Sequence, residues 1–158
     1  MRKNKFLIFY LSFLLVLNSC GFQLRKPIQL DFKTYSIIGE NSQIINLIDK
    51  QFSFSNIEKV SDSNADLIIE FIGNNYQKRI LSLAGNGQIG EFELIQTIEY
   101  RVNLNGQWTE PRRLEAIREY TYDPTLYNAA RAEEGYLKDS MIDQLSRSII
   151  IEISNLRE

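Results

Sequence analysis

The chain has 158 residues, a formal net charge of −2, a single cysteine and no histidine. Without histidine, serine and cysteine nucleophiles lack their usual base, and a metal site would have to be built from carboxylates alone. The acidic balance also argues against a nucleic-acid or polyanion binder, which would need an excess of basic residues. We therefore expect no enzymatic activity, no cofactor and no nucleic-acid partner.

The amino terminus has the pattern of an export signal. Three basic residues, Arg2, Lys3 and Lys5, precede an apolar run over residues 6–17. This run is too short to span a hydrocarbon core of about 30 Å, which takes about 20 residues of helix. The sequence thus predicts a signal peptide over residues 1–19, which is removed rather than kept as an anchor.

Cys20 follows this segment directly. The residues around it, Leu17, Asn18, Ser19 and Gly21, resemble the bacterial lipobox, whose cysteine receives a diacylglycerol before cleavage, although Asn18 departs from the small or apolar residue usual there. We interpret Cys20 as a lipidation site that binds the membrane through its acyl chains, since two or three such chains hold a protein stably on a membrane surface. The alternative is an ordinary secretory signal in which Cys20 is incidental.

The mature chain is long enough for one domain. Residues 20–33 are expected to form a lipidated tether, and residues 34–158 the domain. Cleavage removes three of the eighteen basic residues and none of the twenty acidic ones, so the formal net charge becomes −5. Any anionic ligand must then be bound by a few placed cations.

The first half of the domain has the pattern of a strand, a helix and a strand. Residues 34–39 are β-rich, and apolar residues recur at helical spacing between residues 43 and 53. Residues 65–72 are strongly β-branched, and residues 78–84 continue the extended pattern beyond Gly73. We expect one long strand with a bulge or bend at this glycine.

Two Asn-Gly pairs, Asn86-Gly87 and Asn105-Gly106, predict tight hairpin turns, in which both central residues have positive φ. The strand between the turns alternates in polarity. One parity is apolar, with Phe92, Leu94, Ile98, Tyr100 and Val102. The other is polar, with Glu91, Glu93, Thr97, Glu99 and Arg101. We expect one buried face and one face in water. Residues 107–122 predict a further strand, with Pro111 at an edge position or a bulge.

Asp123 and Pro124 have the composition of a helix start. Apolar residues then recur every three, four or seven positions, namely Leu126, Ala130, Leu137, Met141, Leu145, Ile149 and Ile153. This row predicts a long amphipathic helix over residues 125–154 that lies across the sheet. The order of elements predicts an α+β fold, a two-layer sandwich with a four-stranded, mixed, mostly antiparallel sheet and two helices on one face. Its first two strands would be parallel, through a right-handed crossover.

Three stretches carry a family resemblance. Residues 20–25, residues 79–94 and residues 118–123 with the helix behind them resemble the LptE family of lipopolysaccharide-assembly lipoproteins. The resemblance implies a lipoprotein on the periplasmic side of the outer membrane that plugs the lumen of an LptD-like β-barrel, helps that barrel assemble and contacts lipopolysaccharide. Phe22 is compatible with outer-membrane sorting. The alternative is an outer-membrane-anchored periplasmic binding or scaffolding lipoprotein of another assembly.

The resemblance also implies the lipopolysaccharide contacts. Arg131, eight residues after Asp123, matches a basic position near the lipopolysaccharide site of the family, and a guanidinium can bind a phosphate bidentately. The alternative is an exposed helix arginine without a ligand. Lys78 and Arg79 are further candidates, but they are adjacent on a strand and face opposite ways, so only one of them can join Arg131.

Two other groups of residues allow more than one interpretation. Glu91 and Glu93 lie about 7 Å apart by strand rise, a spacing that overlaps the carboxylates of inverting glycosidases. A solvated strand face explains this pair more simply, so a hydrolase remains only a competing hypothesis. The aromatic residues Tyr120, Tyr122, Tyr127 and Trp108 suit an interface with a barrel, and equally the core and rim of a small sheet.

Overall fold

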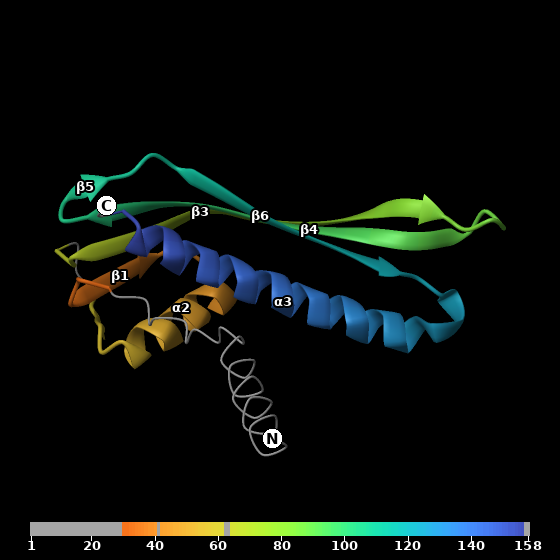
Figure 1. Ribbon diagram of the computed structural model, residues 1–158, viewed down its shortest axis with the longest axis horizontal. Helices are drawn as coiled ribbons and strands as arrows, with labels where there is room; N and C mark the ends of the chain where they lie inside the picture. The colour runs from red at the N-terminus through yellow and green to blue at the C-terminus, as the bar shows by residue number, and fades with distance from the viewer. Residues whose placement is uncertain (1–29, 41, 62–63, 157–158) are drawn as a thin grey trace, which may run out of the picture.

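The computed structural model describes residues 30–40, 42–61 and 64–156, so the expected signal peptide, Cys20 and most of the tether lie outside the described residues. The elements are β1 (Thr34–Ile38), α2 (Ser42–Phe54), β2 (Glu58–Lys59), β3 (Leu67–Leu83), β4 (Ile89–Leu104), β5 (Gln107–Trp108), β6 (Arg112–Thr121), the 3-10 turn η1 (Pro124–Leu126) and α3 (Tyr127–Ser154). Figure 1 shows an elongated, two-layered molecule with α2 and α3 on the same face of the sheet. Among the described helices, none is both long and apolar enough to cross a membrane.

The sheet has six strands in the order β2-β1-β3-β4-β5, and β6 also pairs with β4. β1 runs parallel to β3, whereas β3 and β6 are both antiparallel to β4. The predicted α+β class and the parallel first pair are therefore confirmed. The sheet has six strands rather than the expected four. One addition is β2, a two-residue strand too short to show a pattern. The other arises because the expected strand over residues 107–122 is divided into β5 and β6. The division includes Pro111, which has no N–H to donate to a neighbouring strand.

The β3–β4 hairpin is the longest feature of the sheet. Its register shifts between Phe71 and Gly73, so the predicted irregularity at this glycine is confirmed. The prediction for its turn is wrong in part, because only Gly87 has positive φ there. The chain makes a wider loop, in which the Ala84 N–H donates to the Gln88 carbonyl over 2.7 Å. The second turn has the predicted geometry, with φ of 52° at Asn105 and 86° at Gly106.

The core lies between the sheet and the two helices. Of the apolar row predicted for α3, five residues are buried and Leu137 is partly buried, the buried ones being Ala130, Met141, Leu145, Ile149 and Ile153. Leu126 is 58% exposed because it belongs to η1, before α3 begins. Phe32, within the range expected for the tether, is buried against Phe52 with ring centroids 5.4 Å apart.

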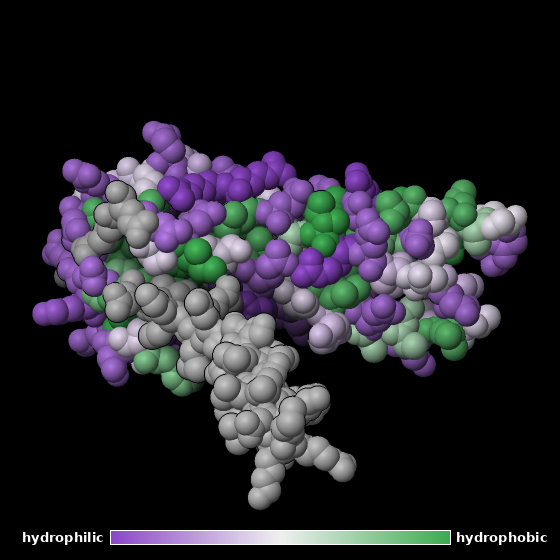
Figure 2. Space-filling model, in the orientation of Figure 1, coloured by the Kyte–Doolittle hydropathy of each residue, from purple (hydrophilic) through white to green (hydrophobic). Residues whose placement is uncertain are grey.

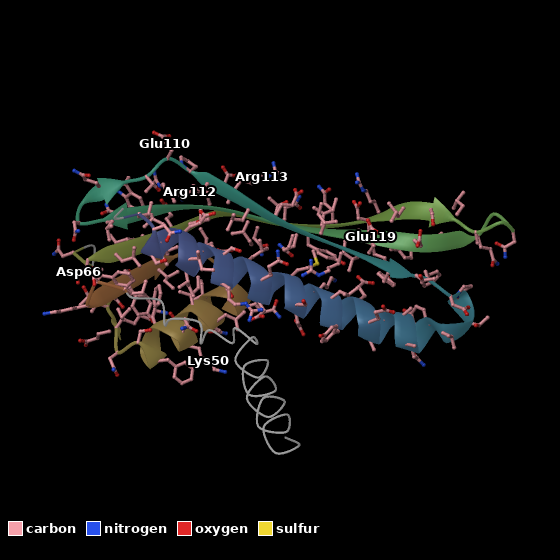
Figure 3. All side chains as sticks on the ribbon, in the orientation of Figure 1. Lys50, Asp66, Glu110, Arg112, Arg113 and Glu119 are labelled. Carbon is pink, nitrogen blue, oxygen red and sulfur yellow. The ribbon has the colours of Figure 1, made fainter. Side chains whose placement is uncertain are left out.

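The carboxyl-terminal half of α3 is joined to the sheet by polar contacts as well. The Tyr100 hydroxyl donates to Glu152 Oε2 over 2.6 Å, and Arg112 donates to the same oxygen over 3.1 Å. Figure 3 labels Arg112 and its neighbour Arg113 at the start of β6. Arg113 pairs instead with Glu115, over 3.4 Å. Alternation along β6 thus directs Arg112 toward the helix layer and Arg113 to the open face of the sheet.

The open face of the sheet is not wholly in water, contrary to the prediction. Glu93 is only 6% exposed, although it belongs to the polar parity of β4. It lies directly opposite Arg79 of β3, whose Nε donates to Glu93 Oε2 over 2.5 Å. Because β4 has neighbours on both sides, a side chain on its open face is covered by the side chains of β3 and β6.

Candidate functional site

A cleft of about 530 Å³ lies between the hairpin half of the sheet and the first turns of α3. It is lined by Lys78, Tyr120, Tyr122, Tyr127, Ala130, Arg131, Glu134, Gly135 and Lys138. Lys78 comes from β3, and Tyr120 and Tyr122 come from the end of β6 and the residues after it. In Figure 1 this part of α3 lies at the end of the molecule that carries the β3–β4 turn.

Strand and helix periods bring these side chains together. Lys78 is the register partner of Leu94, whose buried side chain marks the helix-facing side of the sheet. On α3, Arg131, Glu134 and Lys138 are spaced by three and four residues, so they share one helix face. The small residues Ala130 and Gly135 lie on the same turns, and a Cβ at Gly135 would meet no atom within 4 Å. The surface of α3 beside Gly135 is therefore open where this residue lines the cleft.

Glu134 is the centre of a hydrogen-bond network in the cleft. Its Oε2 accepts from Lys78 Nζ over 2.7 Å and from the Tyr120 hydroxyl over 3.1 Å. Its Oε1 accepts from the Tyr76 hydroxyl over 2.9 Å and lies 3.4 Å from Lys138 Nζ. Each carboxylate oxygen therefore has one lysine and one tyrosine as partners.

Aromatic rings complete the surroundings of the two lysines. Lys78 Nζ lies 4.0 Å from the centroid of the Phe92 ring, and Lys138 Nζ lies 3.9 Å from that of Tyr76. A cation over an aromatic face is attracted by the ring quadrupole. The side chain of Glu134 is 19% exposed and that of Lys78 is 30% exposed, so both charges are partly removed from water.

The pKa values follow from this geometry. Burial by itself raises the pKa of Glu134, but hydrogen bonds from Lys78 and Tyr76 outweigh it and hold the pKa at about 2. Burial lowers the pKa of Lys78, but its hydrogen bonds with Glu134 and Tyr120 outweigh that effect and raise it. The pKa of Tyr76 is raised, first by burial and then by its bond to Glu134. The lysine and the carboxylate therefore stay charged at neutral pH.

Arg131 differs from the two lysines. It is exposed and, in the part of the chain that the structure describes, it has no ion pair and no side-chain hydrogen bond. Lys78, Arg131 and Lys138 contribute three positive charges to the lining, against one negative charge from Glu134. The described lining thus has an excess of two positive charges, in a chain with a negative net charge. Such a cleft is suited to an anion.

The structure separates the three predicted contact residues. Lys78 and Arg131 line the same cleft, whereas Arg79 lies on the opposite face of the sheet, paired with Glu93. Sequence reasoning missed Glu134 and Lys138. Their spacing from Arg131 was the available signal, since positions 131, 134 and 138 fall on one side of a helix.

Of the four aromatic residues singled out in the sequence, Tyr120, Tyr122 and Tyr127 line the cleft. Trp108 does not; its ring lies 4.4 Å from the Arg101 guanidinium, far along β4 from Lys78. Glu91 and Glu93 also lie outside the cleft lining. The Ser82 hydroxyl donates a hydrogen bond to Glu91 over 2.7 Å, and Arg79 donates one to Glu93. Nothing in this arrangement favours a carboxylate pair acting on a sugar.

Comparisons with known proteins agree with the family resemblance of the sequence. The family model described as LptE, lipopolysaccharide-assembly, matches residues 28–153. The LPS-assembly lipoprotein LptE of Yersinia enterocolitica is 27% identical over 142 residues, which cover 86% of this chain and 69% of that protein. The protein of the same name from Yersinia pestis is 24% identical over the same length, with the same coverage.

Solved structures show the same fold. The crystal structure of the rare lipoprotein B from Shewanella oneidensis has a TM-score of 0.70 and 25% identity, covering 78% of this chain and 96% of that chain. The solution NMR structure of an uncharacterized lipoprotein B from Nitrosomonas europaea has a TM-score of 0.67 and 26% identity, covering 85% and 90%. The family match spans the sheet and almost all of α3, so this chain belongs to the LptE family of lipopolysaccharide-assembly lipoproteins.

Proposed function

We propose that the chain is an outer-membrane lipoprotein, anchored on the periplasmic side by acyl chains on Cys20, that docks in an LptD-like β-barrel and contacts lipopolysaccharide through the cleft. Family membership supports the role in lipopolysaccharide assembly, and it supports a non-enzymatic protein. The observation that carries the ligand contact is the exposed, unpaired Arg131 in a described lining with an excess of positive charge.

The ligand group that fits this cleft is a phosphate. Arginine binds phosphate through two parallel N–H bonds, and hydrogen bonds to an ionised group are roughly twice as strong as neutral ones. Tyr122 and Tyr127 also line the cleft. A volume of about 530 Å³ lies in the range of ordinary ligand pockets. The cleft therefore accepts a phosphorylated sugar of lipopolysaccharide rather than the entire molecule.

The shape of the domain supports barrel docking. α3 has 28 residues, which at about 1.5 Å per residue makes it about 42 Å long. Figure 1 shows the helix and the hairpin running along the long axis of a narrow body. A body of this shape can enter a barrel lengthwise and extend beyond a hydrocarbon core of about 30 Å.

The ligand contact is tested with Arg131→Glu. A charge-assisted bond from arginine to phosphate contributes about 1.5 to 3 kcal/mol, so this variant should bind lipopolysaccharide at least tenfold more weakly. Arg147→Glu is the matched control, since Arg147 is an exposed arginine of α3 outside the cleft lining. Equal affinities of the wild type and Arg131→Glu would remove the ligand contact from the proposal.

Barrel docking is tested separately, by affinity purification of the acylated chain. Recovery of a large outer-membrane β-barrel protein in a one-to-one ratio is the expected result. Recovery of other periplasmic proteins without a barrel would favour the alternative, a scaffolding lipoprotein of another assembly.

A further inference from the structure

The ammonium group of Lys78 is fully used inside the protein. A lysine ammonium has three N–H donors. Its Nζ lies 2.7 Å from Glu134 Oε2 and 2.8 Å from the Tyr120 hydroxyl, and the Phe92 ring is 4.0 Å away. The ammonium group of Lys78 therefore has three partners for its three N–H groups, namely two hydrogen-bond acceptors and one aromatic ring face. Among the described residues, Lys78 therefore has no N–H left for a ligand, whereas Arg131 keeps all of its donors.

Glu134 can release Lys78 without losing all its partners. The Lys78 bond is made by Oε2, while Tyr76 and Lys138 approach Oε1. If a ligand oxygen bound the Lys78 ammonium in place of Glu134, the carboxylate would still have the hydroxyls of Tyr76 and Tyr120 and the ammonium of Lys138 as partners. Leaving a partly buried carboxylate without any partner would be costly, so these remaining contacts are what make the exchange accessible.

We propose that Glu134 is an internal competitor of the ligand phosphate for Lys78, and that this competition sets an affinity threshold that phosphate monoesters pass and phosphate diesters do not. The inference rests on the proposed function, in that it takes the cleft to be the phosphate-binding site. It adds Glu134 as the residue that sets how strongly a phosphate must bind Lys78 to be accepted.

The selectivity follows from charge. A phosphate monoester carries about −1.5 to −2 charges and three free oxygens at pH 7. A diester carries one charge on two free oxygens, no more than the carboxylate that it would have to displace. Only the monoester offers Lys78 a stronger partner than Glu134 does, and it can also reach Arg131 with a remaining oxygen. Glu134 thereby excludes the diester headgroups that are common in membranes.

The experiment uses the acylated full chain in detergent micelles, titrated by calorimetry with short-chain phosphatidic acid, a monoester, and with short-chain phosphatidylglycerol, a diester. The variant is Glu134→Gln, which keeps an oxygen acceptor for Tyr76 and removes the negative charge. Glu133→Gln is the matched control, because Glu133 is the exposed neighbour outside the cleft lining. Both variants change the net charge equally.

The wild type should bind the monoester more tightly than the diester. In Glu134→Gln, the affinities for both lipids should rise by about tenfold or more, because each ligand loses the same competing carboxylate, and the gain for the more highly charged monoester should be at least as large as that for the diester. Glu133→Gln should behave as the wild type does. The same affinities in Glu134→Gln as in Glu133→Gln, or a loss of affinity, would show that Glu134 has only a structural role.

A second variant keeps the test decisive if Glu134→Gln does not fold. Lys78→Met should bind the monoester at least tenfold more weakly, because the ligand loses the ammonium that Glu134 gives up. Unchanged binding by Lys78→Met would overturn the proposal, since Lys78 would then never leave Glu134. Failure of the proposed function has a different signature, in which the wild type binds neither lipid and Arg131→Glu changes nothing with lipopolysaccharide.

Discussion

The Glu134 network makes the stability of the domain depend on pH in a way that one variant can isolate. Its partners lower the pKa of Glu134 from 4.5 to about 2. Because the folded-state pKa lies below the ordinary value, this stabilisation is fully present above about pH 4.5 and is lost as the pH falls toward about 2. Each unit of pKa corresponds to about 1.4 kcal/mol, and solvent screening at this partly exposed site reduces the total to about 1 to 3 kcal/mol.

Glu134→Gln should therefore lower the free energy of unfolding by about 1 to 3 kcal/mol at pH 7, and by less than half as much at pH 3. Urea unfolding of the wild type and the variant at both values measures the difference. Glu133→Gln is again the control, with little effect at either pH. The reasoning fails if Glu134→Gln is equally destabilising at pH 7 and pH 3, because the loss would then come from packing rather than from the charge.

Two further predictions concern the core and the anchor. Leu145 is 2% exposed in α3, so Leu145→Ala should lower the free energy of unfolding by about 2 to 5 kcal/mol in a denaturant titration. Ile151→Ala, on the same helix at a residue 38% exposed, should lower it far less. Similar losses in the two variants would mean that α3 packs through another face. Cys20→Ala should release the protein from membranes without unfolding the domain, and mass spectrometry of the wild-type amino terminus should find acyl chains on Cys20. An unmodified Cys20 would contradict the lipoprotein anchor.

The sequence predicts well what depends on short periods. The Asn105-Gly106 turn, the irregularity at Gly73 and the buried row of α3 all follow from local chemistry or from strand and helix spacing. Strand alternation also separates Lys78 from Arg79, and the structure shows these two side chains on opposite faces of the sheet. These features require no knowledge of which strand lies beside which.

The features that were missed depend on contacts between distant parts of the chain. Glu134 contacts Tyr76, which is 58 residues away in the sequence, and Lys78, which is 56 residues away, and no local sequence pattern predicts such contacts. Glu93 is buried because Arg79 lies beside it on the neighbouring strand, a fact of register rather than of polarity. A two-residue strand such as β2 is too short to show a periodic pattern, so it can be identified only from its pairing in the folded sheet.

The unequal strand edges of the sheet bear on self-association. Within the residues that the structure describes, β6 pairs with β4 on one side only, and five of its ten residues are charged: Arg112, Arg113, Glu115, Arg118 and Glu119. β1 covers β3 only as far as Glu70, so in the described chain the rest of that β3 edge has no partner strand. Beyond Arg79 this edge becomes apolar, with Ile80 53% exposed and Leu83 64% exposed. Charged side chains discourage one edge from pairing with another chain, and apolar ones do not. Aggregation of the isolated domain in concentrated solution should therefore start at the hairpin end of β3, while the charged edge of β6 stays unpaired.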